Sequence, residues 1–336
     1  MKIAHVRERN APAGSPWRLA AALDADGARW LDLEEARQGL LVEDPRHAHN
    51  SVLFRQPITT LDDHLARGLR VDALNAIREG YARAADDDEA HLDASDLDFG
   101  PPILRPPSFR DFYAFEQHVG TMWKRRDMQI PEAWYRLPIF YFSNVSEIRG
   151  PGDAVHAPRG SSELDYELEV AALIDTPVRD LDAGRGEEAI GGYMVLNDWS
   201  ARDLQREETT VRLGPAKGKD FASSIGPWLV TPDELADVRK DKGYDLSMTA
   251  SVNGTELSRG TWSTAHFSFG EMVERASADV RLRPGDLLGS GTVGTGCLLE
   301  IRDETLGRYL QPGDSVTLEI ERLGALTAPV VGRPQP

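Results

Sequence analysis

Three Pro-Gly-Asp triplets, at residues 151–153, 284–286 and 312–314, place the tightest constraint on what this chain can fold into. Each triplet precedes an apolar or alternating run. Proline suits the first central position of a tight turn, and glycine suits the second, where φ is positive. Because tight turns that separate short apolar runs are typical of strands, the sequence predicts an α+β fold that is β-rich after about residue 100.

An Asn-Gly pair marks one hairpin in this β-rich part. Residues 246–252 and 255–257 flank Asn253-Gly254, and Asn-Gly favours the turn that matches the twist of the flanking strands. Helices are expected to be few, and their patterns cover about 109–125, 200–210, 268–277 and a short segment from Thr231, whose Thr-Pro-Asp-Glu pattern is that of a capping box.

The first hundred residues have a different pattern. Residues 1–60 indicate short strands and turns, and leucines over 60–85 recur at helical spacing. The acidic run 86–89 is interpreted as a solvated connector, with a calcium-binding loop as the alternative, and a proline-rich stretch follows. We therefore predict a small β-rich N-terminal domain with its connector over residues 1–100, and a larger domain over 101–336.

Composition and charge exclude several classes of protein. The chain has 336 residues, 40% of them hydrophobic, and a formal net charge of −17, which disfavours partners such as nucleic acids and anionic membranes. The N-terminus lacks the apolar stretch of a secretion signal, so a soluble cytoplasmic protein is expected. The one cysteine, Cys297, excludes a disulfide framework and a multi-thiolate zinc site, and we expect it to be a small buried hydrophobe.

Three acidic residues alternate with apolar ones over residues 164–170. On a strand, Asp165, Glu167 and Glu169 would share one face, with same-face Cα atoms roughly 7 Å apart. Glutamate side chains can converge on one ion from such positions. The alternative is an amphipathic strand whose acidic face is wetted by solvent.

Asp198 follows an apolar, strand-like run and precedes a helix start, for which Ser200 is the expected N-cap and Asp203 the third helical residue. A strand end is a common place for catalytic side chains, although Asp198 alone could belong to a turn. Small residues over 214–224 would let backbone carbonyls and a serine hydroxyl approach an ion. Such an all-oxygen site favours Mg²⁺, Mn²⁺ or Ca²⁺ over zinc.

Five motifs occur in one order along roughly residues 105–325, and together they resemble the fumarylacetoacetate hydrolase family. They are Asp111-Phe112-Tyr113-x-x-x-Gln117-His118, Leu164-Asp165-Tyr166-Glu167-Leu168-Glu169, Asn197-Asp198-Trp199-Ser200-Ala201-Arg202-Asp203-x-Gln205, Gly214-Pro215-x-x-Gly218-Lys219-x-Phe221 and Ser290-Gly291-Thr292. The resemblance implies the mixed β-roll catalytic domain of that family over 101–336. The N-terminal third resembles the small domain of the longer members only in length and position.

The resemblance also implies roles for individual residues. The implied metal ligands are Glu167, Glu169, Asp198, Asp111 and Ser223, with Mg²⁺ as the expected cofactor and Ca²⁺ or Mn²⁺ as alternatives. The implied catalytic residues are His118 as the general base, Glu300 as its acidic partner in an apolar strand, and Lys219, Arg202 and Gln205 as stabilisers of an oxyanion. The implied substrate-binding residues are Tyr113, Lys124 and Thr292.

The function implied is hydrolysis of a carbon–carbon bond in a β-diketo acid, such as a fumarylacetoacetate-like or acylpyruvate-like substrate of aromatic catabolism, by a homodimeric enzyme. Relatives use the same site for decarboxylation, isomerisation or dehydration of 2-oxo acids, and the metal motifs do not separate these reactions. A third reading is a non-catalytic metal-binding or ligand-binding protein. At residues 141–147 the sequence differs from the Tyr-His-Gly-Arg segment of the long members. Because this region shapes the substrate pocket in the family, the resemblance does not identify the substrate.

One motif points to a different function. Gly289-x-Gly291-x-x-Gly294 matches the dinucleotide fingerprint, which requires a helix directly after it. Residues 297–301 indicate instead a short strand-like run. We therefore expect no nucleotide cofactor.

Overall fold

The computed structural model describes residues 1–12, 14–47, 51–84 and 90–333. The acidic run 86–89 lies outside the described residues. Among the described residues, twelve strands form one mixed sheet. They are β1 (Lys2–Glu8), β2 (Arg18–Ala22), β3 (Arg29–Asp32), β4 (His91–Asp93), β5 (Leu97–Phe99), β6 (Phe109–Phe112), β7 (Phe140–Phe142), β8 (Ile148–Arg149), β10 (Leu168–Ile174), β11 (Ile190–Asp198), β13 (Ser223–Val230) and β18 (Leu287–Gly289).

The order across this sheet is β4-β3-β2-β1-β13-β11-β10-β18-β6-β7, with β5 beside β1 and β8 beside β13. A second sheet has the order β17-β16-β19-β20, from strands β16 (Ser247–Val252), β17 (Thr255–Thr261), β19 (Ser315–Ile320) and β20 (Gly324–Pro329). In the described part of the chain, two short pairs complete the strands, β9 (Leu164–Asp165) with β12 (Ser200–Ala201) and β14 (Arg239–Lys240) with β15 (Gly243–Tyr244).

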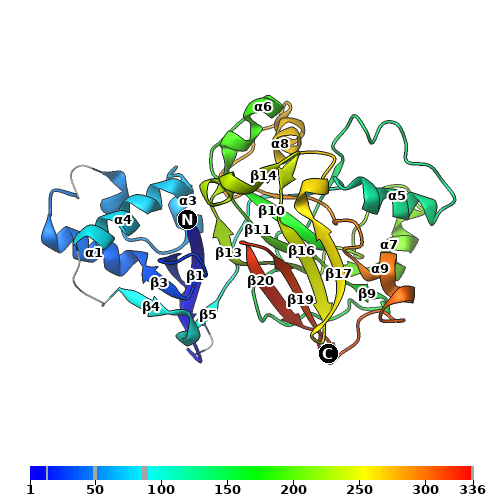
Figure 1. Ribbon diagram of the computed structural model, residues 1–336, viewed down its shortest axis with the longest axis horizontal. Coiled ribbons are helices and arrows are strands. Elements are labelled where there is room, and N and C mark those ends of the chain that lie inside the picture. The colour runs from blue at the N-terminus through cyan, green and yellow to red at the C-terminus, as the bar shows by residue number, and fades with distance from the viewer. Residues whose placement is uncertain (13, 48–50, 85–89, 334–336) are drawn as a thin grey trace.

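Helices lie around these sheets. The α-helices of the described residues are α1 (Leu33–Glu43), α3 (Leu61–Ala66), α4 (Asn75–Ala84), α5 (Glu116–Lys124), α6 (Ala183–Gly186), α7 (Arg202–Thr209), α8 (Phe269–Ser277) and α9 (Leu298–Ile301). Short 3₁₀ turns cover Val52–Phe54, Val71–Leu74, Ala94–Asp96, Glu187–Ala189, Pro232–Val238, Trp262–Thr264 and Arg302–Glu304. Figure 1 shows α1, α3 and α4 together on one side of the molecule, and α5, α7 and α9 on the other.

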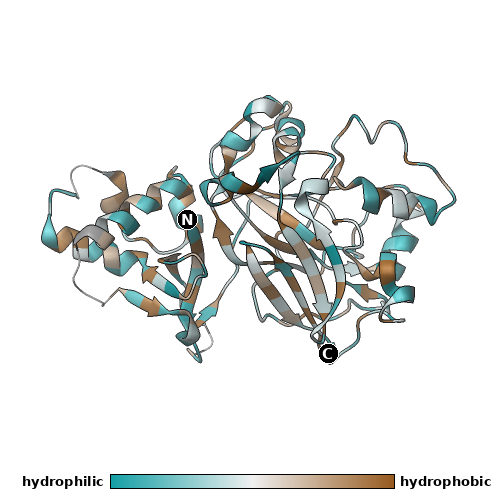
Figure 2. Cartoon of the chain, viewed as in Figure 1, coloured by the Kyte–Doolittle hydropathy of each residue, from teal (hydrophilic) through white to brown (hydrophobic). Residues whose placement is uncertain are grey.

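The strand β10 separates two hydrophobic cores, because alternate side chains of a strand point to opposite faces. Val170 and Ala172 pack into a core that the second sheet covers, whereas Ala171 and Leu173 pack into a core that α1, α3 and α4 cover. Both faces of β10 are therefore buried, and Figure 2 shows apolar residues along the central strands and polar residues on the outer helices. Each large apolar side chain buried in this way stabilises the fold by roughly 1.5–3 kcal/mol.

The turns predicted from Pro-Gly-Asp and Asn-Gly are confirmed. Gly152, Gly285 and Gly313 have φ of 81°, 94° and 100°. In each triplet the aspartate accepts a hydrogen bond from the backbone N–H three residues earlier, at 2.7, 2.8 and 2.8 Å. Asn253 and Gly254 both have positive φ between β16 and β17.

Several predicted caps and helices are wrong. Thr231 does not cap its segment, since its hydroxyl oxygen contacts the N-terminal ammonium of Met1, and the segment is a 3₁₀ turn. Ser200 lies in β12, and α7 begins only at Arg202 because residues 200–201 pair with β9. The helical spacing over residues 60–85 corresponds to α3 and α4, which are separated near Gly68, whose φ is 73°.

The helix α1 was not predicted. It begins at Leu33, inside the part for which only strands and turns were expected, and the Asp32 side chain caps it by accepting from the N–H groups of Glu34 and Glu35. A capping box is present at Ser268 and Glu271, at the start of the predicted helix α8.

The large sheet continues across residue 100. Lys2 and Ile3 of β1 pair with Val230 and Leu229 of β13, so the first strands extend the sheet of the larger part. The domain boundary near residue 100 stays a prediction. Among the described residues, none of the helices combines the length and the apolar character that a bilayer span requires.

Candidate functional site

Three carboxylates meet near the ends of adjacent strands. Asp111 lies on β6, Glu169 on β10 and Asp198 at the end of β11, and one oxygen of each lies within 4.8 Å of the others. All three residues are at most 2% exposed. The sheet brings them together because β18, β10 and β11 lie side by side, and β6 lies beside β18. Glu169 and Asp198 also share one face with Leu196, as the period of two predicts.

A glycine makes room for the three carboxylates of Asp111, Glu169 and Asp198, which are called the acidic group below. Gly289 of β18 lies opposite Asp111 on one side and Ala171 on the other. A Cβ atom at Gly289 would lie 2.2 Å from Asp111 Oδ1. Any side chain at this position would displace the Asp111 carboxylate.

The electrostatics of the acidic group favour a bound cation. Burial, followed by the charge of Asp198, raises the pKa of Asp111 well above its usual range, and burial, followed by the charge of Asp111, does the same to the pKa of Glu169. Asp111 Oδ1 and Asp198 Oδ1 are buried, and neither accepts a hydrogen bond from a described residue. Unpartnered carboxylate oxygens are what a hard divalent cation binds, so the residues fit the predicted metal.

Glu167 lies beside this group rather than in it. Its carboxylate contacts Lys219 Nζ and lies 2.8 Å from Arg202 Nη2. Burial would raise its pKa, but Lys219 and Arg202 hold it well below the usual range. Glu167 therefore links the acidic group to two cations, and its role as a direct metal ligand stays a prediction.

Lys219 and Tyr141 both contact Asp198. The Lys219 ammonium bridges Asp198 and Glu167, and the Tyr141 hydroxyl donates to Asp198 Oδ2 at 2.6 Å. The sequence did not single out Tyr141. Its position was visible only as part of the segment that departs from the long family members, and β7 places it opposite Asp111.

His118 and Glu300 form the predicted pair. Nδ1 of His118 lies 2.9 Å from Glu300 Oε2, and the two side chains are 4% and 3% exposed. No described residue accepts a well-aligned hydrogen bond from Nδ1, a geometry that often tightens when substrate binds. Tyr113 packs edge-on against the His118 ring, with centroids 5.4 Å apart.

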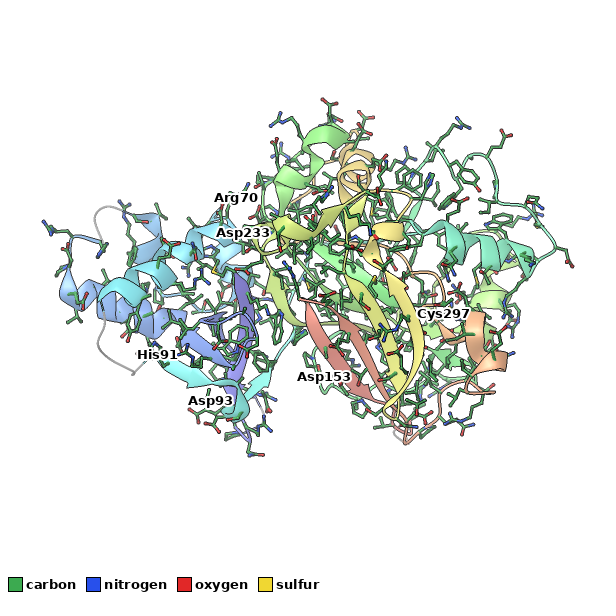
Figure 3. All side chains as sticks on the ribbon, viewed as in Figure 1. Arg70, His91, Asp93, Asp153, Asp233 and Cys297 are labelled. Carbon is green, nitrogen blue, oxygen red and sulfur yellow. The ribbon has the colours of Figure 1, made fainter. Side chains whose placement is uncertain are left out.

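Glu300 lies on the helix α9, so its predicted place in a strand is wrong. A strand here would need a neighbour to pair with, and residues 298–301 form a helical turn against α5 instead. Cys297 is buried as predicted, and its Sγ lies 3.6 Å from Glu300 Oε2 (Figure 3 labels Cys297 beside α9).

The remaining predicted site residues differ in whether they contact the site. The Gln205 side chain accepts from Arg202 Nη1 at 3.1 Å, and the Thr292 hydroxyl donates to Glu169 at 3.2 Å. Ser223 is buried and pairs with Asp198 across the strands. Lys124 is exposed at the end of α5, and no contact of the described residues joins it to the site.

The glycines of the dinucleotide-like motif serve close packing. A Cβ at Gly291 would lie 2.5 Å from the Phe112 carbonyl oxygen, and one at Gly294 would lie 2.3 Å from the Gln117 side chain. Among the described residues no helix follows until α9, which has only four residues. The βαβ context of a dinucleotide site is missing from this described segment.

Comparison with known proteins identifies the family of this chain. The model of the family described as "Fumarylacetoacetate (FAA) hydrolase C-terminal" matches residues 108–331, more than half of the chain. The chain belongs to the fumarylacetoacetate hydrolase family. The predicted β-rich α+β fold of this family is confirmed by solved structures. That of fumarylacetoacetate hydrolase from the psychrophilic Exiguobacterium antarcticum matches with a TM-score of 0.71, at 23% identity over 99% of this chain and 100% of that one.

Hydrolases and isomerases both occur among its similar proteins. The 2,4-didehydro-3-deoxy-L-rhamnonate hydrolase of Sphingomonas sp. (strain SKA58) is 34% identical over 190 residues, which are 56% of this chain and only 62% of that relative. The structure of 5-carboxymethyl-2-hydroxymuconate delta-isomerase from Mycobacterium smegmatis has a TM-score of 0.65, at 22% identity over 100% of both chains. The two solved structures show the shared fold alone.

Proposed function

We propose that this member of the fumarylacetoacetate hydrolase family is a hydrolase that cleaves a carbon–carbon bond in a β-diketo acid. The observation that carries the proposal is the His118–Glu300 pair, with atoms 2.9 Å apart, in the same buried region as the acidic group of Asp111, Glu169 and Asp198. A histidine paired with a carboxylate is suited to activate water, which hydrolysis requires and isomerisation does not.

His118 acts as the general base. With Nδ1 facing Glu300, Nε2 is the nitrogen left to take a proton from water, and Glu300 holds the ring and stabilises its protonated form. Tyr113, a proposed substrate contact, packs against the His118 ring with centroids 5.4 Å apart. The base therefore lies beside the residues that would hold the substrate, and the hydroxide attacks its carbonyl carbon.

Lys219 and Arg202 supply positive charge where negative charge develops. Both are held by Glu167, and Gln205 accepts a hydrogen bond from Arg202. We propose that they stabilise the oxyanion formed by the attack. Loss of one such donor typically lowers the rate by about 10²–10³-fold.

Asp111, Glu169 and Asp198 would hold a divalent cation, with Glu167 and Ser223 as further proposed ligands. We propose Mg²⁺, with Mn²⁺ or Ca²⁺ as alternatives. When bound, such an ion supplies Lewis-acid stabilisation of the enolate that cleavage leaves.

Tyr113, Lys124 and Thr292 are proposed to contact the substrate. The protein is proposed to be a cytoplasmic homodimer in aromatic catabolism, and light scattering would test its assembly.

A substrate screen tests this function. Purified protein with Mg²⁺ is mixed with acylpyruvates, fumarylacetoacetate and 2-oxo-enoic acids, and diketone absorbance and products are followed. If the enzyme is a hydrolase, the diketone absorbance is lost and two fragments appear, each of which contains a carboxylic acid or a ketone. Conversion to a single product of equal mass would favour isomerisation, release of CO₂ would favour decarboxylation, and no turnover on any substrate would contradict the enzymatic reading.

A further inference from the structure

Asp165 is a buried carboxylate to which no role in the proposed reaction has been assigned. It is 0% exposed. It accepts hydrogen bonds from Arg202 Nε at 2.7 Å and from the backbone N–H groups of Leu298 and Leu299 at 2.8 and 3.0 Å. One side chain thus binds an arginine of α7 and the first turn of α9.

These partners belong to the two halves of the site. On one side, Arg202 also pairs with Glu167 at 2.8 Å, and Glu167 contacts Lys219 next to the acidic group. On the other side, α9 carries Glu300, which faces His118. Asp165 therefore joins Arg202, which lies beside the acidic group, to α9, which carries Glu300.

The helix α9 needs this junction. The first N–H groups of a helix have no partner within the helix, and the N-cap residue usually supplies an acceptor. The N-cap here is Cys297, and its side chain caps no N–H among the described residues. Asp165 supplies the acceptor from another strand, and Arg125 Nη2 donates to the Glu300 carbonyl oxygen at 3.2 Å at the other end of the turn.

We propose that Asp165 is a positioning residue that fixes α9, and through Glu300 the His118 ring, relative to the acidic group. The inference rests on the proposed function for its kinetic part. A helix of four residues has little stability of its own, so its orientation depends on such anchors. The strand alternation that placed Asp165 on one face with Glu167 and Glu169 gave no indication of this link.

Hydrogen–deuterium exchange of the full-length protein tests the structural part without any substrate. Asp165→Asn keeps the size of the side chain but places amide hydrogens where an acceptor is needed. We expect the N–H groups of residues 298–301 to exchange about tenfold faster or more, with no change over the β16–β17 hairpin. Unchanged exchange at 298–301 would overturn the proposal.

A matched control is Asp175→Asn. Asp175 is also buried, accepts from the backbone N–H of Val71 at 3.1 Å and pairs with an arginine, Arg70, at 3.7 Å. Asp175→Asn should leave exchange at 298–301 as it is. If it accelerates exchange there equally, the effect is general destabilisation and the proposal fails. Asp165→Glu, which keeps the charge, replaces Asp165→Asn if the latter does not fold, and faster exchange at 298–301 is again expected.

Kinetics separate positioning from a merely structural role. Asp165→Asn should lower kcat by about 10–100-fold while KM changes by less than about threefold. In Asp165→Asn/Glu300→Gln the loss should be smaller than the product of the two single losses, because both changes act in part through His118. Losses that multiply would overturn the inference, whereas a wild-type protein without turnover defeats the proposed function and leaves the exchange result to decide the link to α9.

Discussion

At the scale of single residues, the acidic group is expensive to bury. Asp111, Glu169 and Asp198 approach within 4.8 Å with almost no exposure to water, and like charges at such separations repel strongly where water is excluded. Lys219 offsets part of this repulsion through its contact with Asp198. Two carboxylate oxygens still lack a partner among the described residues. Repulsion within the acidic group therefore destabilises the folded protein when no cation is bound, and a bound divalent cation would remove this repulsion.

Glu169→Gln tests the metal site. The amide keeps the size of the side chain and removes one negative charge from the acidic group. We expect the rise in thermal stability on adding Mg²⁺ or Mn²⁺ to disappear; for the wild type it should be about 2.7 kcal/mol at a hundredfold excess over Kd. Thermal unfolding with and without metal measures this.

The control is Asp175→Asn, a buried carboxylate just after the end of β10 that lies outside the acidic group. It should keep the metal-dependent rise, even if its own midpoint falls. A full rise in Glu169→Gln would show that the assigned group does not hold the ion.

At the scale of elements, the important feature of β18 is that Gly289 has no side chain and so leaves space for Asp111. Gly289→Ala would place a Cβ atom 2.2 Å from Asp111 Oδ1, so Asp111 must move out of the acidic group. We expect Mg²⁺ affinity to fall about tenfold or more, measured by titration of the thermal midpoint.

Gly184→Ala is the matched control. Gly184 lies in α6 with open space around its Cα, and alanine is the better helix former. This variant should be unchanged or slightly more stable and should bind Mg²⁺ like the wild type. Equal affinity in Gly289→Ala and wild type would contradict the role given to Asp111.

His5 joins three elements and predicts a dependence on pH. Its Nδ1 lies 2.8 Å from the Pro101 carbonyl oxygen and its Nε2 accepts from the Leu61 N–H at 3.0 Å, so the folded protein requires the neutral ring. Burial lowers the pKa of His5 below its ordinary value of 6.5. The unfolded chain therefore takes up the proton first, and this stability is present above about pH 6.5 and lost as the pH falls below it, by up to about 1.4 kcal/mol per unit.

The variant His5→Gln keeps an acceptor for Leu61 and does not titrate. The difference in thermal midpoint between wild type and variant should shrink from about pH 7 to about pH 5. His156→Gln, at a half-buried histidine of a loop, is the control for the change of residue type. A constant difference for His5→Gln would show that the ring is not held neutral.

How far the sequence predicts the fold depends on whether a pattern is local. Tyr166, Leu168 and Val170 do pack into one core, as the alternation predicts, because the period of a strand is a local property. The place of Glu300 on a helix was missed, since the anchor of that helix is Asp165, more than a hundred residues earlier.

The site shows the same division. The motifs predict that His118 and Glu300, and Glu169 and Asp198, belong to one site, and the fold brings each set together. Tyr141 and Gly289 were missed because their roles come from the order of β7, β6 and β18 in the sheet, which no single segment encodes. The family motif implies Glu167 as a metal ligand, which stays a prediction, and in the fold two cations from distant elements contact it beside the acidic group.

At the scale of the whole molecule, the N-terminal part shields the central sheet. The core that contains Leu229 and Ile225 of β13 also contains Ile3 of β1 and side chains of α1, α3 and α4. Deleting residues 1–100 would expose this apolar surface and the edge of β13. We expect the remaining 101–336 to be insoluble or to unfold without cooperativity, as judged by size-exclusion chromatography and thermal unfolding. A soluble fragment that keeps the Mg²⁺ response would show instead that residues 101–336 fold independently.

The central claim is that His118, oriented by Glu300 beside a metal-binding acidic group, activates water to cleave a carbon–carbon bond. The most direct test compares wild type and His118→Gln for turnover of the best acylpyruvate-type substrate with saturating Mg²⁺, with metal binding followed by thermal shift. The account predicts a loss of kcat of about 10²–10⁴-fold with the Mg²⁺-dependent rise in stability unchanged. Turnover within a few-fold of the wild type in His118→Gln would contradict it.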